Sequence, residues 1–124
     1  MKKMISGILL LTAILTIFLS CRRNHDSGTP PKKYPADVAV AWINMQRKLL
    51  VGTPGLLPHV TGRVYAYTGL TMYESIVPGM HGYQSIASQL NGGLALPGIE
   101  QGKKYYWPAS ANAALAFILK NLLP

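Results

Sequence analysis

The sequence predicts an all-α fold. Three segments repeat apolar residues at helical spacing, prolines and glycines fall between these segments, and no segment alternates apolar and polar residues as a half-buried strand would. We expect three to four helices that form part of a larger helical bundle, preceded by a signal-peptide helix and a disordered tether. The chain therefore divides into residues 1–20, 21–35 and 36–124.

Residues 1–20 have the composition of a bacterial export signal. Two lysines come first, an apolar run covers residues 4–19, and Ser20 precedes Cys21, the only cysteine. A cysteine directly after a small residue resembles a lipoprotein cleavage box, which predicts lipidation of Cys21 and anchoring to the bacterial cell envelope after export. Ordinary signal cleavage and an uncleaved anchor are the alternatives, because Phe18 and Leu19 replace the usual leucine and small residue of the box. The apolar run is of marginal length for a membrane span.

Residues 21–35 predict a flexible basic tether. The segment is rich in Gly, Ser and Pro, which disfavours packed structure, and its basic residues are Arg22, Arg23, Lys32 and Lys33. This charge suits anionic lipid headgroups, and solubility and spacing explain it equally well. Removing residues 1–20 takes away two lysines and lowers the net charge from +8 to +6. Residues 36–124 carry only six basic against three acidic residues, without a basic stripe, so no nucleic-acid partner is expected.

The first helix of the folded part is expected from Asp37 to about residue 50. Asp37 suits an N-cap or the first turn, where a negative charge is favourable. The apolar residues at helical spacing, which predict the buried stripe, are Val38, Ala41, Trp42, Met45 and Leu49. A connector with several glycines and prolines follows over residues 52–58.

The second helix, expected from about residue 59 to residue 77, is apolar or aromatic nearly all round. Such a helix is predicted to be buried. A seam of small residues, Gly62, Ala66 and Gly69, would let a neighbouring helix approach closely. Pro78 and Gly79 end the helix, because proline removes a backbone donor and glycine opens φ.

Arg63 and Glu74 are the two charged residues of this second helix. Their spacing places them about 16 Å apart along the helix axis, so they cannot pair with each other. If both are buried, each needs a partner from another segment. We interpret both as possible structural or second-shell supports for a site built elsewhere.

A short helix is expected over residues 83–90, followed by a long loop and a last helix from Trp107. Pro108 suits the first turn of that helix, and its buried stripe is predicted to contain Ala111, Leu115, Ile118 and Leu122. The apolar surface of these helices exceeds what so few elements can cover. We therefore expect the remaining core to lie in a carboxy-terminal half.

Several motifs then occur in a characteristic order. They are Arg-x-x-Ala-Tyr from Arg63, Tyr-Glu from Tyr73, Pro-Gly-Met from Pro78, Gln-Leu-Asn-Gly from Gln89 and Trp-Pro-x-x-x-Asn-Ala-Ala from Trp107. Residues 36–124 thereby resemble the amino-terminal helical region of bacterial vanadium-dependent haloperoxidase-like proteins, within the superfamily of type 2 phosphatidic acid phosphatases and vanadium haloperoxidases. The departures are His81, where proline is usual, and Gly62, where Ser or Ala is more typical.

The resemblance implies an enzyme whose catalytic residues lie in the carboxy-terminal half. In the family, a lysine, two arginines and backbone N–H groups surround a vanadate or phosphate oxyanion, and two histidines bind the metal or transfer protons. The family motifs Arg-Pro, Ser-Gly-His and Ser-Arg are absent from this sequence. The chain alone is thus predicted to have no catalytic residue and no cofactor, with vanadate or a phosphate substrate implied only for the complete protein.

Histidines and aromatic residues are the remaining candidates for a site. His25, His59 and His81 lie far apart without a helical pair or nearby carboxylates, so no metal site is expected. Two interpretations exist for the aromatic residues: they line a substrate entry in the complete enzyme, or they pack in the core, which is the favoured interpretation. The set is Tyr65, Tyr67, Tyr73, Tyr83, Tyr105, Tyr106 and Trp107.

Two functions stay open at this stage. The first is the front part of an exported, membrane-tethered haloperoxidase or phosphatase, inactive without its catalytic half. The alternative is a free-standing lipoprotein whose helical module binds a partner or ligand through an exposed apolar face.

Overall fold

The computed structural model describes residues 28–100 and 102–123. The predicted export signal, the lipidation site Cys21 and residues 22–27 of the tether lie outside this range. All regular structure in the described residues is helical, which confirms the all-α prediction. In chain order the elements are the 3-10 helix η1 (Pro31–Lys33), α2 (Asp37–Gly52), α3 (Pro58–Ile76), the 3-10 helices η2 (Val77–Gly79) and η3 (Ala87–Gln89), and α4 (Trp107–Leu122).

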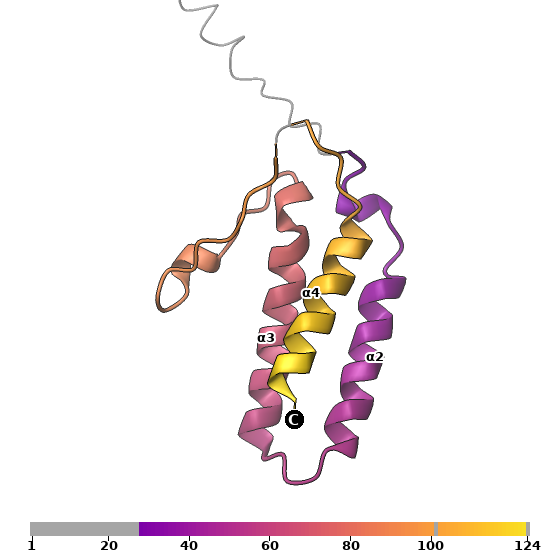
Figure 1. The fold of residues 1–124 in the computed structure, drawn as a ribbon, viewed down its shortest axis with the longest axis vertical. Helices are drawn as coiled ribbons and strands as arrows, with labels where there is room; N and C mark the ends of the chain where they lie inside the picture. Colours follow the sequence, from indigo (N-terminus) through magenta and orange to yellow (C-terminus); the bar gives the residue numbers. More distant parts are fainter. Residues whose placement is uncertain (1–27, 101, 124) are drawn as a thin grey trace, which may run out of the picture.

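The three α-helices lie side by side, with α4 between the other two in the view of Figure 1. A short connector joins the end of α2 to the start of α3, and α4 packs against both helices. Two side-chain hydrogen bonds link α4 to its neighbours. The Trp42 indole donates to Asn112 Oδ1 at 2.8 Å, and the Ser110 hydroxyl donates to the Ser75 carbonyl at 2.8 Å.

The main apolar core lies where the end of α2, the start of α3 and the end of α4 meet. Leu50, Val64 and Leu119 are buried together at this point, one from each helix. Half-buried apolar side chains surround them, namely Trp42, Leu56, Ile118, Leu122 and Leu123. The predicted stripe of α4 is therefore largely correct, since Ala111 and Leu115 are buried as well.

The predicted stripe of α2 is correct for Val38 and Trp42, which are half-buried, and wrong for the rest of the helix. Gln46 and Leu50 are the buried residues of this helix, whereas Met45 and Leu49 are exposed. The buried face of this part of α2 therefore lies about one residue away from the predicted stripe. Its centre is Gln46, a polar residue, and not an apolar one. Asp37 lies in the first turn as expected, behind Ala36 as N-cap.

The prediction of a helix buried all round is also wrong for α3 within the described chain. Val64 and Thr68 are its buried residues, and one face of the helix packs against α4. The small-residue seam has no neighbour, because a Cβ atom built at Gly62 or Gly69 would meet no atom within 4 Å.

The helix expected over residues 83–90 does not form. This stretch contains only the 3-10 helix η3, in a segment that runs beside α3 and away from α2 (Figure 1). Two of its backbone N–H groups bond to side chains instead of to helix carbonyls: that of Ile86 donates to Glu74 Oε1 and that of Ala87 to Ser85 Oγ. Such side-chain bonds compete directly with helix formation.

Residues 28–35, the described part of the predicted tether, contact the segment before α4. Tyr34 packs edge-on against Tyr106 with ring centroids 5.3 Å apart. Gly28 adopts a positive φ of 84° and lies beside the Lys104 side chain. The chain therefore approaches α2 from the side on which the loop before α4 lies.

Candidate functional site

Glu74 fixes the long loop after α3. Its carboxylate is half-buried near the end of α3 and accepts hydrogen bonds from the Ser85 hydroxyl at 2.7 Å and from the Ile86 N–H at 2.8 Å. The preceding residue in α3 adds another contact, because the Tyr73 hydroxyl donates to the Gln84 carbonyl at 2.7 Å. Both carboxylate oxygens thus have partners inside this chain, supplied by the segment after α3.

The loop fixed by Glu74 encloses an apolar hollow, which we call the loop hollow. It has a volume of about 610 Å³ and lies between α3, α4 and the segment from Ala87 to Tyr105. Leucine, isoleucine, proline and alanine side chains supply most of its wall. A partly open apolar cavity of this size falls within the range of small-molecule sites.

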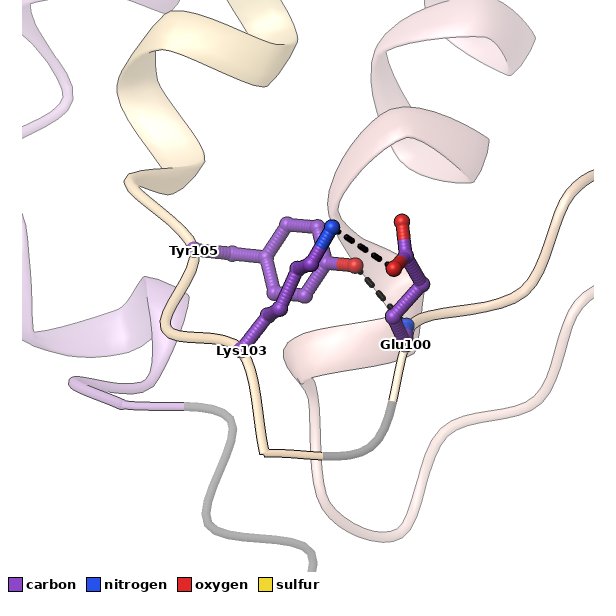
Figure 2. Close-up of polar contacts among 3 residues, drawn as sticks. All are labelled: Glu100, Lys103 and Tyr105. Atoms are coloured by element: carbon purple, nitrogen blue, oxygen red, sulfur yellow. Dashed lines mark hydrogen bonds and ion pairs between the residues drawn. The ribbon is translucent and has the colours of Figure 1, made fainter.

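Two aromatic rings and a tight turn close one end of the loop hollow. Tyr105 stacks on Trp107 with ring centroids 5.5 Å apart and an angle of 22° between the rings. As Figure 2 shows, the Tyr105 hydroxyl accepts a hydrogen bond from the Glu100 N–H at 2.8 Å, and Lys103 pairs with the Glu100 carboxylate at 2.6 Å. The main-chain bond holds the Tyr105 ring in place, while the exposed ion pair adds little stability.

A second, open hollow lies between α2 and α3, and we call it the α2–α3 groove. It has a volume of about 220 Å³. Its walls are Ala39, Trp42, Ile43 and Gln46 from α2, Tyr65, Thr68, Gly69 and Met72 from α3, and Leu115 from α4. Ile43 and Tyr65 are 46% and 43% exposed, so large apolar surface faces solvent on both sides of the groove.

Gln46 is the polar group that distinguishes the α2–α3 groove. The residue is only 2% exposed, and its Nε2 atom has no hydrogen-bond partner among the described residues. Thr68, the other buried polar residue of the groove, satisfies its hydroxyl within α3 by donating to the Val64 carbonyl at 2.6 Å. An unpaired buried amide is costly, so the buried floor of the groove carries one unsatisfied amide nitrogen.

The structure does not bring Arg63 and Glu74 together. Arg63 is exposed on α3, whereas Glu74 lies at the loop hollow. His59 and His81 are exposed, and no group of three potential metal ligands occurs in residues 28–100 and 102–123. Core packing of the aromatic set holds for Trp107 and is wrong for the exposed Tyr65, Tyr67, Tyr83 and Tyr106.

The two hollows lack the cationic side chains that hold vanadate or phosphate. An oxyanion is held by converging cations and N–H groups, yet the walls of both hollows contain no lysine, arginine or histidine. No chemical step at an oxyanion is therefore derived from these residues. Within the same described range, no helix has the length and apolarity to cross a membrane.

Sequence reasoning missed Gln46 and Ser85. Gln46 lies within a segment that repeats apolar residues at helical spacing. Periodicity favours the apolar stripe one residue away and so does not indicate that Gln46 is buried. Ser85 carries no local signal, because its role depends on Glu74, which lies eleven positions earlier.

Comparison of the chain with protein-family models, with curated proteins and with solved structures found no match.

Proposed function

We propose that this chain is the amino-terminal helical layer of an exported, membrane-anchored enzyme of the vanadium-dependent haloperoxidase or acid phosphatase type. In this proposal the helices are a scaffold, and the oxyanion-binding residues come from a carboxy-terminal catalytic half. The motif order from Arg63 to Asn112 supports the family, and an apolar surface on two helices supports a scaffolding role.

The observation that carries the proposal is the α2–α3 groove. It combines exposed apolar side chains on two helices with a buried, unpaired amide at Gln46. Such a surface suits a covering helix, because an added helix buries the exposed apolar walls on α2 and α3. Gly62 and Gly69 add open surface on α3 that a second segment can approach closely.

The direct test is an activity assay on the purified chain. We expect no hydrolysis of a phosphate monoester and no vanadate-dependent oxidation of bromide, because the oxyanion-binding motifs of the family do not occur in this sequence. The positive control is a complete haloperoxidase assayed under the same conditions. Measurable turnover in either assay that remains after further purification would contradict the proposal.

The alternative function is a free-standing lipoprotein module that binds a partner or ligand through its apolar surface. The loop hollow favours this alternative, because the chain by itself builds a cavity of about 610 Å³. The two functions differ in how the α2–α3 groove behaves. The scaffold requires a covering polypeptide there, whereas the binding module does not.

A further inference from the structure

We propose that the loop hollow binds an unbranched aliphatic chain, such as the alkyl part of a fatty acid or lipid. This inference does not depend on the proposed enzyme family, because the hollow is built from the described residues of this chain. It concerns a different surface from the α2–α3 groove.

The shape of the loop hollow is the first argument. Along α4 its wall extends from Trp107 to Ile118, which corresponds to about 16 Å of helix. The opposite side is formed by α3 from Leu70 onward and by the loop residues around Leu94 and Leu96. A cavity that extends this far along a helix offers room for an extended chain.

The chemistry of the wall is the second argument. Its polar groups are already engaged: Glu74 accepts from Ser85 and Ile86, and the Ser110 hydroxyl donates to the Ser75 carbonyl. The Ser75 hydroxyl in turn donates to the Met72 carbonyl at 2.7 Å. Thr71 is the only serine or threonine of this wall that makes no hydrogen bond within the described chain. Because so few polar groups are free, the ligand part inside the hollow must be apolar.

The surroundings of Trp107 also favour an apolar ligand. Its ring is buried and stacked on Tyr105, and its Nε1 atom is buried without a partner among the described residues. The indole therefore presents ring carbons to the hollow and no accessible donor. Each methylene group that such a wall removes from water contributes favourably to binding, so affinity should rise with chain length.

The loop gives the hollow a way to open. Exposed loop residues such as Leu94 and Leu96 form the outer wall, and the loop is fixed to α3 mainly through Glu74 and Tyr73. Breaking these few hydrogen bonds frees the outer wall without disturbing the packing of α4 on α3. A chain can thus enter from the side while any polar head stays in solvent.

Tryptophan quenching tests this assignment, because the chain has only two tryptophans and each lines a different hollow. The probe is dodecanoate brominated at its last carbon, added below its micelle concentration to the detergent-free full chain. In Trp42→Phe, where Trp107 is the reporter, we expect saturable quenching. In Trp107→Phe, where Trp42 reports on the α2–α3 groove, we expect no saturable quenching. Absence of quenching in Trp42→Phe made in the Cys21→Ser background, or quenching of Trp42 alone, would overturn the proposal.

A pair of substitutions on α4 places the bound chain within the hollow. In the Trp42→Phe background, Ala114→Phe fills the wall and should weaken the probe by about tenfold or more, as expected when two methylene groups lose their burial. Ala113→Phe, on the exposed side of the same helix, should leave binding unchanged. If the two variants weaken the probe equally, the site is not the loop hollow.

A second pair applies if Ala114→Phe does not fold. Leu96→Asp puts a charge into the loop wall without touching a helix, and Val51→Asp puts the same charge on an exposed residue outside the hollow. We expect weaker binding only for Leu96→Asp, and equal binding by both variants contradicts the proposal.

One further comparison distinguishes two sources of the aliphatic chain. A free fatty acid and the acyl chain predicted on Cys21 share the required chemistry. If the protein's own anchor fills the hollow, only the Cys21→Ser chain will be quenched, whereas a free ligand quenches the lipidated chain as well. If neither form is quenched, the hollow does not bind an aliphatic chain.

Discussion

The two faces of α3 differ in how completely the chain covers them. On one face α3 packs against α4, where Val64 joins Leu50 and Leu119 in the core. On the other face, Tyr65 and Gly69 border the open α2–α3 groove next to the unpaired amide of Gln46. The chain thus buries the apolar residues of α3 on one side of the helix only. Overall apolarity therefore predicts how much surface a helix must bury, and the neighbours present in the chain decide where that burial occurs.

The largest expected effect concerns the closed face. Leu119→Ala removes a side chain that is only 3% exposed and leaves a cavity between α3 and α4. We expect the free energy of unfolding to fall by about 2–5 kcal/mol, measured by denaturant unfolding. Phe117→Ala on the same helix, where the ring is 70% exposed, is the control and should change stability little. Similar losses for both variants would mean that α4 does not pack as described.

Gly79 tests the packing at the other end of the α3–α4 contact. A Cβ atom at this position would overlap the Trp107 ring, so Gly79→Ala forces either the backbone or the indole to move. Overpacking of this kind should lower the free energy of unfolding by about 1–3 kcal/mol. The emission spectrum of Trp107 in the Trp42→Phe background should shift to the red as its ring becomes more exposed. Unchanged stability and emission would contradict this close contact.

Substitution of Gln46 tests the open face, and here the free energy of unfolding is expected to rise. Gln46→Met keeps the length of the side chain and removes a buried amide that has no described partner. In the isolated chain we expect stability to rise by about 1 kcal/mol, because no hydrogen bond is lost and a desolvation cost disappears. Thermal unfolding of the two proteins measures this difference. A clear loss of stability would show that the amide already has a partner.

The smallest effect is expected at Gly69, on the rim of the groove. An added Cβ would meet no atom within 4 Å, and the residue lies inside α3. Gly69→Ala should therefore raise stability by about 0.5–1 kcal/mol through helix propensity alone, as measured by denaturant unfolding. Destabilisation would indicate that another segment of this chain covers the seam. The opposite signs at Gly69 and Gly79 would define the open and closed sides of the helix pair.

Sequence patterns predicted some of these features and missed others for identifiable reasons. The register of α4 follows from regular apolar spacing, and Leu115 and Ala111 are buried as expected. The register of α2 was missed because a polar residue, Gln46, lies at the centre of its inner face. Periodicity rewards apolar residues and cannot foresee a buried amide.

The loop hollow was not predicted at all. It depends on Glu74 reaching Ser85 and Ile86, which are distant in sequence and carry no motif of their own. These contacts also prevent the expected helix at residues 83–90, because the side chains take backbone donors that a helix would use. A local reading of propensity therefore fails at the point where tertiary hydrogen bonds decide the structure.

The central claim is that a catalytic carboxy-terminal half packs onto the exposed face of α2 and α3. Reading the gene beyond the codon for residue 124, in all three frames, tests this claim most directly. The proposal predicts a downstream segment that encodes Ser-Gly-His followed by Ser-Arg and a further histidine, with helices whose apolar faces suit the α2–α3 groove. The absence of these motifs in every frame would contradict the claim and favour the lipoprotein module that binds its ligand alone.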